Sequence, residues 1–290
     1  MKTLLKAAVM SSTLAVSALL ATVAAAQDTI RFAVTDIDGM ESLQTEMGPF
    51  KDAFEKISGL KVEFFAVSGR TIAVEAMAAD QVDFVLTGPA EYVVFNARLQ
   101  AQPVVTWNRP DYYSNIVVLD ASPVQTVADL KGMKIRVQGN PMFIDMMNAM
   151  GGNGIAMDTG EIFSALQTGV IDGAENNPPT LLEHNHFRAA KYYTQTHHLI
   201  LPEPLLMSKT TWNKLTPEQQ ALVKKLAKEA QLEERDLWVA KENASNEKLK
   251  AEGVEYIEVD TKPFYDATAP VREKYGAQFA ELIQRIEAVQ

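Results

Sequence analysis

The residues best suited to chemistry lie between positions 131 and 177, where an arginine and an amide follow two expected strands. Lys134-Ile-Arg-Val137 predicts a short buried strand that carries Arg136. An amphipathic helical pattern over 163–170 leads to a second, glycine-flanked strand, with Asn176 just beyond its start. A guanidinium pairs with a carboxylate through two parallel hydrogen bonds, which lysine cannot reproduce. The pattern therefore indicates a carboxylate-binding site, although a structural salt bridge explains a strand arginine equally well.

Few other residues are suited to catalysis or metal binding. The chain has no cysteine, which excludes thiol catalysis, thiolate metal sites and disulfides. The histidines are His184, His186, His197 and His198, and neighbours so spaced point to different faces of a helix, so neither pair predicts a metal site. No nucleophile turn, phosphate-binding loop or dinucleotide fingerprint is present. The sequence thus predicts neither an enzyme nor a bound metal or cofactor.

The first 26 residues predict a secretory signal peptide. Lys2 and Lys6 precede an apolar stretch over 7–23, and Ala24-Ala-Ala26 supplies small residues for cleavage; an uncleaved anchor is the alternative. No later segment approaches the roughly 20 apolar residues of a membrane helix. The mature protein would have 264 residues (290 minus 26) and a net charge of −12 (−10 minus two lysines). We therefore expect an exported, periplasmic protein that binds neither nucleic acid nor anionic membranes.

The amino-terminal region alternates strands and helices. Expected strands over 29–34, 60–66 and 82–86 are separated by helical patterns over 41–57 and 70–79, which predicts a mostly parallel sheet with helices on both faces. Ligands of such sheets bind at the carboxyl ends of the strands, where helix N-termini point inward. Three side chains at these places are candidate ligand contacts: Ser68, Thr87 and Tyr92. Each can instead be an ordinary helix cap or a half-buried aromatic.

The rest of the chain crosses to a second region and comes back. A strand over 115–119 leaves the first region, a short helix capped by Thr126 follows, and a second α/β rhythm runs from Met133 to about Leu201. Segment 205–209 then returns to the first region. We therefore predict two lobes joined by crossing hinge strands. Their expected boundaries are residues 27–114 plus about 202–241 for the first lobe and 115–201 plus about 242–290 for the second.

The returning segment is predicted to be mostly helical. Thr216-Pro-Glu-Gln219 is typical of a capping box with proline at the first helical position. The helix that it opens runs towards Gly253, a length that favours a break near Asn243-Ala-Ser245. A last strand over 254–259 precedes two closing helices over 263–287.

From about Pro123 to Gln290 the chain resembles the periplasmic solute receptors of TRAP transporters, the tripartite ATP-independent periplasmic carriers. The matching pieces keep their order and spacing: Ala128-Asp-Leu-Lys-Gly132, Lys134-Ile-Arg-Val137, Phe163-Ser-Ala-Leu-Gln-Thr-Gly-Val-Ile-Asp-Gly173, Glu175-Asn-Asn177, Lys191-Tyr-Tyr193, His198, Ser208-Lys209 and Trp212. The resemblance implies that Arg136 binds the carboxylate of the ligand and that Asn176 orients it. A second arginine, common in that family about twenty residues earlier, is absent near Ile116.

Residues 28 to about 119 resemble a different family, the phosphonate or phosphite receptors of ABC transporters. The matching pieces are Gly39-Met-Glu-Ser-Leu43, Gly59-Leu-Lys-Val-Glu-Phe-Phe65, Asp83-Phe-Val-Leu-Thr-Gly-Pro-Ala-Glu-Tyr92 and Arg109-Pro-Asp-Tyr-Tyr113. The serine- and threonine-rich cradle of those receptors is missing, because its place reads Gln138-Gly-Asn-Pro141. The chain therefore looks like a mosaic of two families with its seam close to Ala128-Asp-Leu-Lys-Gly132.

Both resemblances imply the same fold, a two-lobed α/β periplasmic binding protein (type II-like) with mostly parallel sheets. We expect the protein to capture a small organic anion, a carboxylate such as a sugar acid or dicarboxylate, and to deliver it to the membrane components of a TRAP transporter. Hinge closure around the ligand is expected. The expected contacts are Arg136, Asn176, Glu175 and Asn140 from the second lobe and Ser68, Thr87 and Tyr92 from the first.

Two alternatives remain open at this point. In the first, the amino-terminal lobe sets the ligand, and the protein is an ABC-type phosphonate or phosphite receptor. In the second, the chain is a folded mosaic without a working ligand site, because lobes of different origin need not pre-organise one pocket. The sequence is compatible with a monomer or a dimer.

Overall fold

The computed structural model describes residues 29–288 except positions 36, 38, 59, 68, 108, 110, 111 and 120–122. The predicted signal peptide over 1–26 and the candidate Ser68 therefore lie outside the described residues. Within the described ranges, no helix combines the length and the apolarity that a membrane crossing requires.

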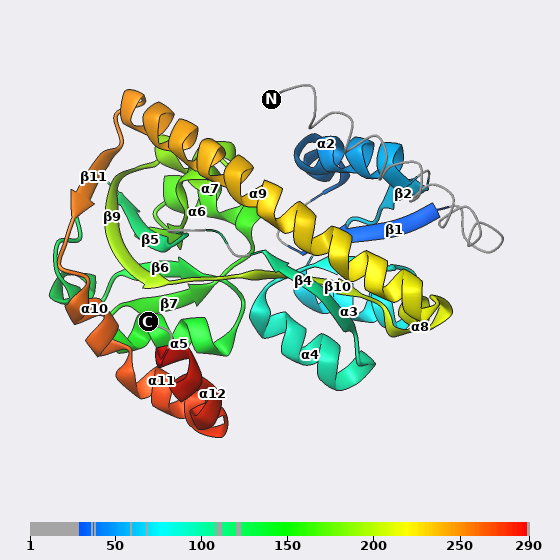
Figure 1. Cartoon of the computed structure of the whole chain (residues 1–290). Helices are drawn as coiled ribbons and strands as arrows, with labels where there is room; N and C mark the ends of the chain where they lie inside the picture. The colour runs from blue at the N-terminus through cyan, green and yellow to red at the C-terminus, as the bar shows by residue number, and fades with distance from the viewer. Residues whose placement is uncertain are drawn as a thin grey trace, which may run out of the picture. The chain divides into compact units, whose positions relative to one another are not determined.

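Contacts between residues divide the chain into two compact units, each built from two segments. Unit 1 comprises the described residues up to Trp107 together with Pro202–Arg235, and unit 2 comprises Arg109–Leu201 together with the chain from Asp236 onwards. The last passage from one unit to the other lies within helix α9 (Pro217–Ala251; Figure 1). The role of each unit as a ligand-binding lobe stays a prediction.

Unit 1 is built on a mixed sheet with the strand order β2-β1-β3-β10-β4. Pairing is parallel among β1, β2 and β3, and β10 runs antiparallel to both β3 and β4. The strands are β1 (Thr29–Val34), β2 (Lys61–Phe64), β3 (Phe84–Leu86), β4 (Gln102–Trp107) and β10 (Glu203–Met207). The helices are α2 (Met40–Ser58), α3 (Arg70–Ala78), α4 (Pro89–Leu99), α8 (Lys209–Lys214) and the first part of α9.

Side-chain alternation along β1 divides the core of unit 1 into two layers. Phe32 belongs to the layer on one face, where it packs with Leu43 of α2 and Trp212 of α8. Ala33 belongs to the layer on the opposite face, together with Phe95 of α4. Both faces of the sheet are therefore covered by helices, as the β-α-β-α-β rhythm predicts.

Unit 2 is built on a second mixed sheet, with the strand order β11-β9-β5-β8-β6-β7. The strands are β5 (Ser114–Leu119), β6 (Lys134–Val137), β7 (Asn153–Ala156), β8 (Gly173–Asn176), β9 (Ala190–Leu199) and β11 (Glu255–Glu258). The α-helices are α5 (Pro141–Ala149), α6 (Ile162–Gln167), α7 (Pro178–Glu183), α10 (Lys262–Ala267), α11 (Ala269–Gly276) and α12 (Ala280–Glu287), besides the end of α9. Short 3-10 turns are η1 (Val127–Leu130), η2 (Thr159–Glu161), η3 (His186–Arg188) and η4 (Ala277–Phe279).

The core of unit 2 also has two layers, one on each face of its sheet. Val117 of β5 packs with Leu166 of α6 and Leu249 of α9 on one face. Its neighbour Ile116 packs with Phe143 of α5 on the other. Strand β5 runs antiparallel to β8 and β9, whereas β6 is parallel to both β7 and β8. The parallel trio β8-β6-β7 places three strand ends at one edge of the sheet.

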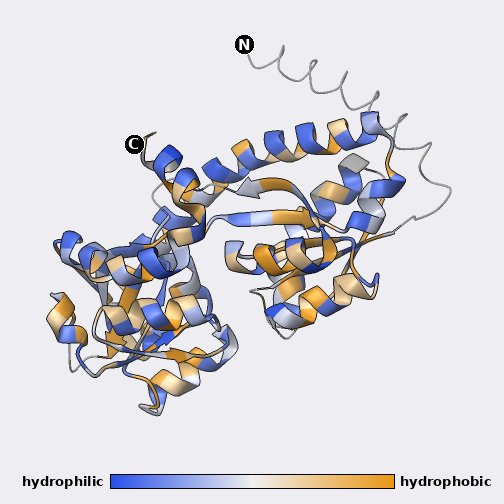
Figure 2. Cartoon of the chain, turned by 90° about the horizontal axis from the view of Figure 1, so that it is seen from below, coloured by the Kyte–Doolittle hydropathy of each residue, from blue (hydrophilic) through white to orange (hydrophobic). Residues whose placement is uncertain are grey.

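The long helix α9 begins as the sequence predicts but continues further. Gln219 Oε1 accepts a hydrogen bond from the Thr216 backbone N–H (2.7 Å), and Thr216 Oγ1 accepts one from the Gln219 N–H (3.3 Å), which confirms the capping box. The predicted break near 243–245 is wrong, since the helix runs unbroken to Ala251. Ser245 is buried and Leu249 lies in the core, so packing outweighs the weak helix propensity of this stretch. Hydrophilic and hydrophobic residues alternate along the helix (Figure 2).

Two other helix boundaries differ from the prediction. The helix expected over 163–170 ends at Gln167, and Val170 is exposed rather than part of the apolar face. Gly169, in the left-handed conformation (φ +69°), turns the chain there. The two helices expected over 263–287 are three, because the chain interrupts the first at Thr268 and restarts it with proline in the first turn of α11.

Gly173 of β8 leaves no room for a side chain, and this close packing yields a prediction. A Cβ atom there would lie 2.5 Å from the Val117 carbonyl oxygen and 2.8 Å from Val118 Cγ1. Because strand backbone cannot move aside easily, Gly173→Ala should lower the free energy of unfolding by about 1–3 kcal/mol. Gly139→Ala is the matched control, with no atom within 4 Å, and should change it by less than about 0.5 kcal/mol. Urea denaturation measures both, and equal stabilities would contradict the packing described.

Candidate functional site

Arg136 is held inside unit 2 on β6, between β8 and β7. Only 2% of the residue is exposed. Its Nε donates a hydrogen bond to the Met157 carbonyl oxygen (2.8 Å), and its Nη2 donates to Thr159 Oγ1 (3.5 Å). Both acceptors come from the chain that follows β7, which pairs in parallel with β6. Strand pairing therefore brings the acceptors to Arg136 and fixes the orientation of the guanidinium.

A buried carboxylate faces the same guanidinium. Glu175 of β8 is also only 2% exposed, and its Oε1 lies 3.8 Å from Nη1 of Arg136. At this distance the two side chains form an ion pair, but the contact is too long for a direct hydrogen bond. Removing one member of such a buried pair leaves an uncompensated charge, whose cost usually exceeds the net contribution of the pair itself. Glu175 thus balances the charge of Arg136 in the apolar interior.

Three helical turns begin at the edge of the sheet where Arg136 lies. Asn140 precedes α5 and its Oδ1 accepts the Met142 N–H (2.9 Å), while Asn177 precedes α7 and its Oδ1 accepts the Thr180 N–H (3.1 Å). Thr159, the partner of Arg136, opens η2. N-terminal amides of helices favour negative charge. The helix N-termini therefore add positive potential beside the Arg136–Glu175 ion pair.

A chain of polar side chains runs from β5 to the loop after β8. Asn115 Nδ2 donates to Tyr193 Oη (3.0 Å), which in turn donates to the Asn176 carbonyl oxygen (3.2 Å). Asn177 Nδ2 donates to Tyr112 Oη (3.2 Å). Tyr193 is 1% exposed, and its burial raises the pKa of the phenol well above the ordinary value. The Asn176 turn is therefore braced by neutral hydrogen bonds.

Two histidines of unit 2 are held neutral by the fold. Burial, the neighbouring His184 and the charge of Arg136 together lower the pKa of His186 to about 3. His186 is fully buried, and neither of its ring nitrogens has a hydrogen-bond partner among the described residues. Burial also lowers the pKa of His198 to about 3, and its Nδ1 contacts Thr196 Oγ1 (2.7 Å). No three or more acidic or histidine side chains of the described part are grouped so as to hold a metal.

The strand ends of unit 1 carry a separate set of polar groups. Thr87 follows β3, is 1% exposed, and its hydroxyl accepts a hydrogen bond from Thr35 Oγ1 (3.1 Å). This hydroxyl pair joins the ends of β3 and β1. Nearby, Arg70 at the start of α3 forms an ion pair with Glu91 in the first turn of α4, with Nη1 and Oε2 2.5 Å apart. Tyr92 is half-buried against the α3–α4 layer of the core.

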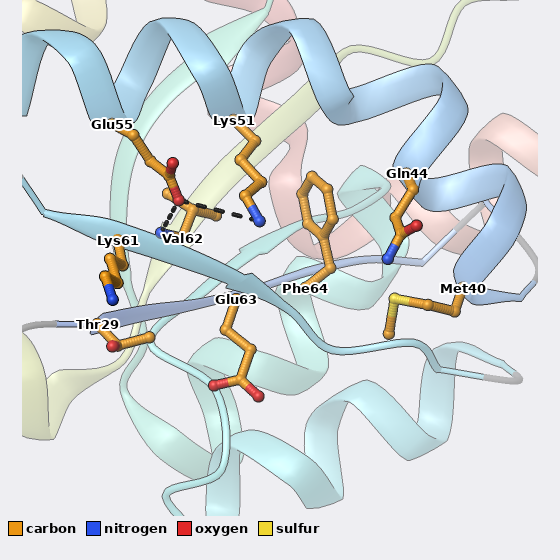
Figure 3. Close-up of a pocket in the computed structure, with 9 residues that line it drawn as sticks. All are labelled: Thr29, Met40, Gln44, Lys51, Glu55, Lys61, Val62, Glu63 and Phe64. Carbon is orange, nitrogen blue, oxygen red and sulfur yellow. Dashed lines mark hydrogen bonds and ion pairs between the residues drawn. The ribbon is translucent and has the colours of Figure 1, made fainter.

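An open pocket of about 450 Å³ lies elsewhere in unit 1, between α2 and the edge strand β2 (Figure 3). Glu55 of α2 accepts the outward N–H of Val62 (2.7 Å) and lies 3.9 Å from Lys51 Nζ. Covering an edge N–H in this way blocks pairing with another strand. None of the ligand contacts predicted from the sequence lines this pocket.

The structure brings together the four candidates of the second lobe at one edge of the unit 2 sheet, whereas Thr87 and Tyr92 belong to unit 1. Sequence reasoning missed the groups that complete each set: Thr159, Asn177, Tyr112 and His186 in unit 2, and Thr35, Arg70 and Glu91 in unit 1. An asparagine directly before two prolines was a visible capping signal for Asn177. The other contacts depend on strand pairing over long sequence separations and carry no local signal.

Two protein families match this chain, each over a different part of it. Residues 115–278, more than half of the chain, match the family described as bacterial extracellular solute-binding protein, family 7. The chain belongs to this family. Residues 32–141 also match the periplasmic substrate-binding proteins of phosphonate ABC transporters. The predicted mosaic is thereby confirmed, and the two matches overlap over 115–141, which contains the predicted seam at Ala128–Gly132.

Solved structures of TRAP periplasmic solute-binding proteins share the fold along most of the chain. One from Pseudomonas putida F1, with bound D-glucuronate, is 51% identical, has a TM-score of 0.76, and covers 90% of this chain and 97% of its own. One from Sulfitobacter sp. NAS-14.1, with bound β-D-galacturonate, is 31% identical, has a TM-score of 0.74, and covers 88% and 97%. These likenesses confirm the predicted two-lobed α/β class.

Sequence relatives match over a shorter stretch. A solute-binding protein of Chromohalobacter salexigens is 38% identical over 58% of this chain, and the 2,3-diketo-L-gulonate-binding periplasmic protein of Escherichia coli K12 is 35% identical over 58%. The chain spans about half the length of these relatives, 50% and 53%.

The neutral state of His186 generates a pH prediction. The unfolded chain takes up a proton near pH 6.5, whereas the folded protein does so only near pH 3. The unfolded state therefore binds more protons between these values, and the free energy of unfolding should fall on acidification, by at most about 1.4 kcal/mol per pH unit for one histidine.

His186→Leu should flatten this dependence between pH 6.5 and 4, as measured by urea denaturation at a series of pH values. His197→Asn is the control, because His197 is exposed and its backbone is in the left-handed conformation (φ 48°), which asparagine adopts readily. Parallel pH profiles for the wild type and His186→Leu would show that His186 is not held neutral.

Proposed function

We propose that the protein is a periplasmic solute receptor that captures a small sugar acid through its carboxylate. Buried Arg136 carries the proposal, because its guanidinium is fixed by Met157 and Thr159 at the edge of the parallel strands. Ligands of α/β sheets bind at this edge. In this reading Arg136 anchors the carboxylate, Asn176 orients it, and Glu175 and Asn140 contact hydroxyl groups.

The neighbours of Arg136 favour a carboxylate ligand. Arginine binds a carboxylate with two parallel hydrogen bonds, and the amides at the start of α5 and α7 add positive potential. The net charge of −12 expected for residues 27–290 is spread over the chain and does not set the local potential at these helix N-termini. Relatives supply the class of ligand: the structures named above hold uronates, and the E. coli relative is named for 2,3-diketo-L-gulonate. All three are sugar acids.

The receptor would deliver its ligand to a TRAP-type membrane transporter, since the matching structures are TRAP solute-binding proteins. An exported location follows from the same relationship and from the signal peptide predicted over 1–26. We infer no catalytic step, because the family consists of proteins that bind solutes.

A phosphonate receptor is the second candidate, favoured by the match over residues 32–141. In unit 2, however, the segment where those receptors carry serine and threonine reads Gln138-Gly-Asn-Pro141, and Asn140 Oδ1 is engaged in capping α5. A dianionic phosphonate would then have Arg136 as its main cation but few hydroxyl donors. The carboxylate reading is therefore preferred.

Calorimetric titration with D-glucuronate tests the proposal. The wild type should bind, and Arg136→Ala should lose on the order of 2–5 kcal/mol of binding free energy, because the ligand carboxylate would be left without its anchor. Arg136→Lys should also bind more weakly, since an ammonium group lacks the planar pair of donors. Arg188→Lys serves as the matched control, because Arg188 is exposed in the same unit.

The ligand panel separates the two candidates. Binding of glucuronate or galacturonate, lost in Arg136→Ala, supports the sugar-acid receptor. Binding of phosphite or a phosphonate alone supports the second candidate. A loss of less than about tenfold in Arg136→Ala, roughly 1.4 kcal/mol, would remove Arg136 from its proposed role.

A further inference from the structure

Two consecutive asparagines of unit 2, the last residue of β8 and the next one, differ in how completely their side-chain amides are hydrogen-bonded. A carboxamide oxygen can accept two hydrogen bonds and its nitrogen can donate two. Oδ1 of Asn177 accepts from the Thr180 backbone N–H (3.1 Å) and from Thr180 Oγ1 (3.0 Å). Nδ2 of Asn177 donates to Tyr112 Oη (3.2 Å) and to Asn176 Oδ1 (3.2 Å). All four positions of the Asn177 amide are therefore occupied.

The first turn of α7 fixes which way the Asn177 amide points. A backbone N–H can only donate, so the atom of Asn177 that faces the Thr180 N–H must be the oxygen. Nδ2 then has to lie on the other side, towards Tyr112 and Asn176. Asn177 is only 5% exposed, and exchanging its oxygen and nitrogen would set two buried donors against each other.

The amide of Asn176 uses only its oxygen. Oδ1 of Asn176 accepts from the Asn177 backbone N–H (2.9 Å) and from Asn177 Nδ2. Both of these groups are donors, so the atom that faces them must again be the oxygen. Nδ2 of Asn176 has no acceptor among the described residues and keeps surface that is accessible to solvent. Its two hydrogens are therefore what Asn176 offers to a ligand.

The register of the unit 2 sheet places Asn176 on the same face as Arg136. Arg136 of β6 pairs in parallel with Ala174 of β8. Register partners on parallel strands point to one face, and so does the side chain two positions further along a strand. Asn176 therefore extends the face of Arg136 towards the carboxyl ends of the strands, where α/β sheets bind ligands.

Capping of α7 does not by itself explain why position 177 is an asparagine. A serine at this position could also accept the N–H three residues later. In unit 1, Ser208 Oγ does so for the Thr211 N–H at the start of α8 (3.1 Å). A serine lacks the NH2 group with which Asn177 reaches Asn176 Oδ1. The asparagine therefore adds to the cap a connection between α7 and Asn176.

We propose that Asn177 is a positioning residue of the ligand site, which holds Asn176 by its oxygen so that Asn176 can only donate hydrogen bonds to the ligand. The inference rests on the proposed function and deepens it, because a group that only donates requires an acceptor. An ionised carboxylate accepts at both of its oxygens and donates at neither. Arg136 and Asn176 then both present donors to the same anionic group of the ligand.

A double-mutant cycle in the full mature chain tests the inference, with D-glucuronate titrated by calorimetry. Asn176→Ala should weaken binding by at least about tenfold. Asn177→Ser keeps a cap on α7 and should weaken binding by about three- to tenfold, because Asn176 loses one of the two hydrogen bonds that hold it. In the Asn176→Ala background the same change should alter the affinity by less than about twofold, since Asn177 then has no amide to position.

Asn148→Ser is the matched control. Asn148 is an exposed asparagine of unit 2 whose Oδ1 also accepts a backbone N–H, that of Gly154 (3.0 Å). This variant should leave the affinity for D-glucuronate within about twofold of the wild type.

Thermal unfolding checks that each variant is folded. If Asn177→Ser does not fold, Asn177→Asp replaces it, because aspartate caps a helix equally well and its charge acts in both backgrounds of the cycle. Unchanged binding in Asn176→Ala, or losses that simply add in the double variant, would overturn the inference. A loss of less than about twofold in Asn177→Ser would do the same, since capping alone would then account for the residue.

Failure of the proposed function looks different, because the wild type would then bind no sugar acid. The positioning role is in that case decided in the free protein, by hydrogen exchange of the side-chain amides measured by NMR and assigned from the signals lost in Asn176→Ala and Asn177→Ser. The Asn177 amide should exchange slowly and the Asn176 amide rapidly. Equal exchange of the two amides would overturn the inference.

Discussion

The burial of one positive charge organises unit 2. A guanidinium that is 2% exposed must have its donors directed at fixed acceptors, because an unsatisfied charge in the interior is costly. Those acceptors are the Met157 carbonyl and the Thr159 hydroxyl, which lie in the chain that follows β7, and the carboxylate of Glu175 on β8. The parallel pairing of β8, β6 and β7 is thus what makes a cation possible here, and the same pairing sets helix N-termini around it.

Local sequence patterns predicted most helices and strands, but they did not predict which side chains contact one another. The strand carrying Arg136 and the capping box of Thr216 and Gln219 follow from neighbouring residues, and the structure contains both. Thr159 lies 23 positions from Arg136 and meets it only because β7 pairs with β6. The helix boundaries that failed, near residues 168 and 243–245, are places where a glycine turn or core packing overrode periodicity. The sequence therefore predicted the residue that could bind a carboxylate, Arg136, but not the residues that contact it.

The mosaic origin of the chain bears differently on its two units. Unit 2 keeps the arginine, glutamate and asparagine that its family resemblance implies, within one hydrogen-bonded edge of the sheet. Unit 1 matches another family for most of its length, yet its strand ends present a buried carboxylate and an arginine. Each unit therefore folds around a polar cluster of its own.

A crystal structure of the mature protein grown with D-glucuronate would show whether Arg136 holds the ligand. We expect the ligand carboxylate within hydrogen-bonding distance of both terminal nitrogens of Arg136, with Asn176 beside it. A ligand whose carboxylate lies away from Arg136, with the guanidinium still bound to Met157, Thr159 and Glu175, would contradict the role proposed for this arginine.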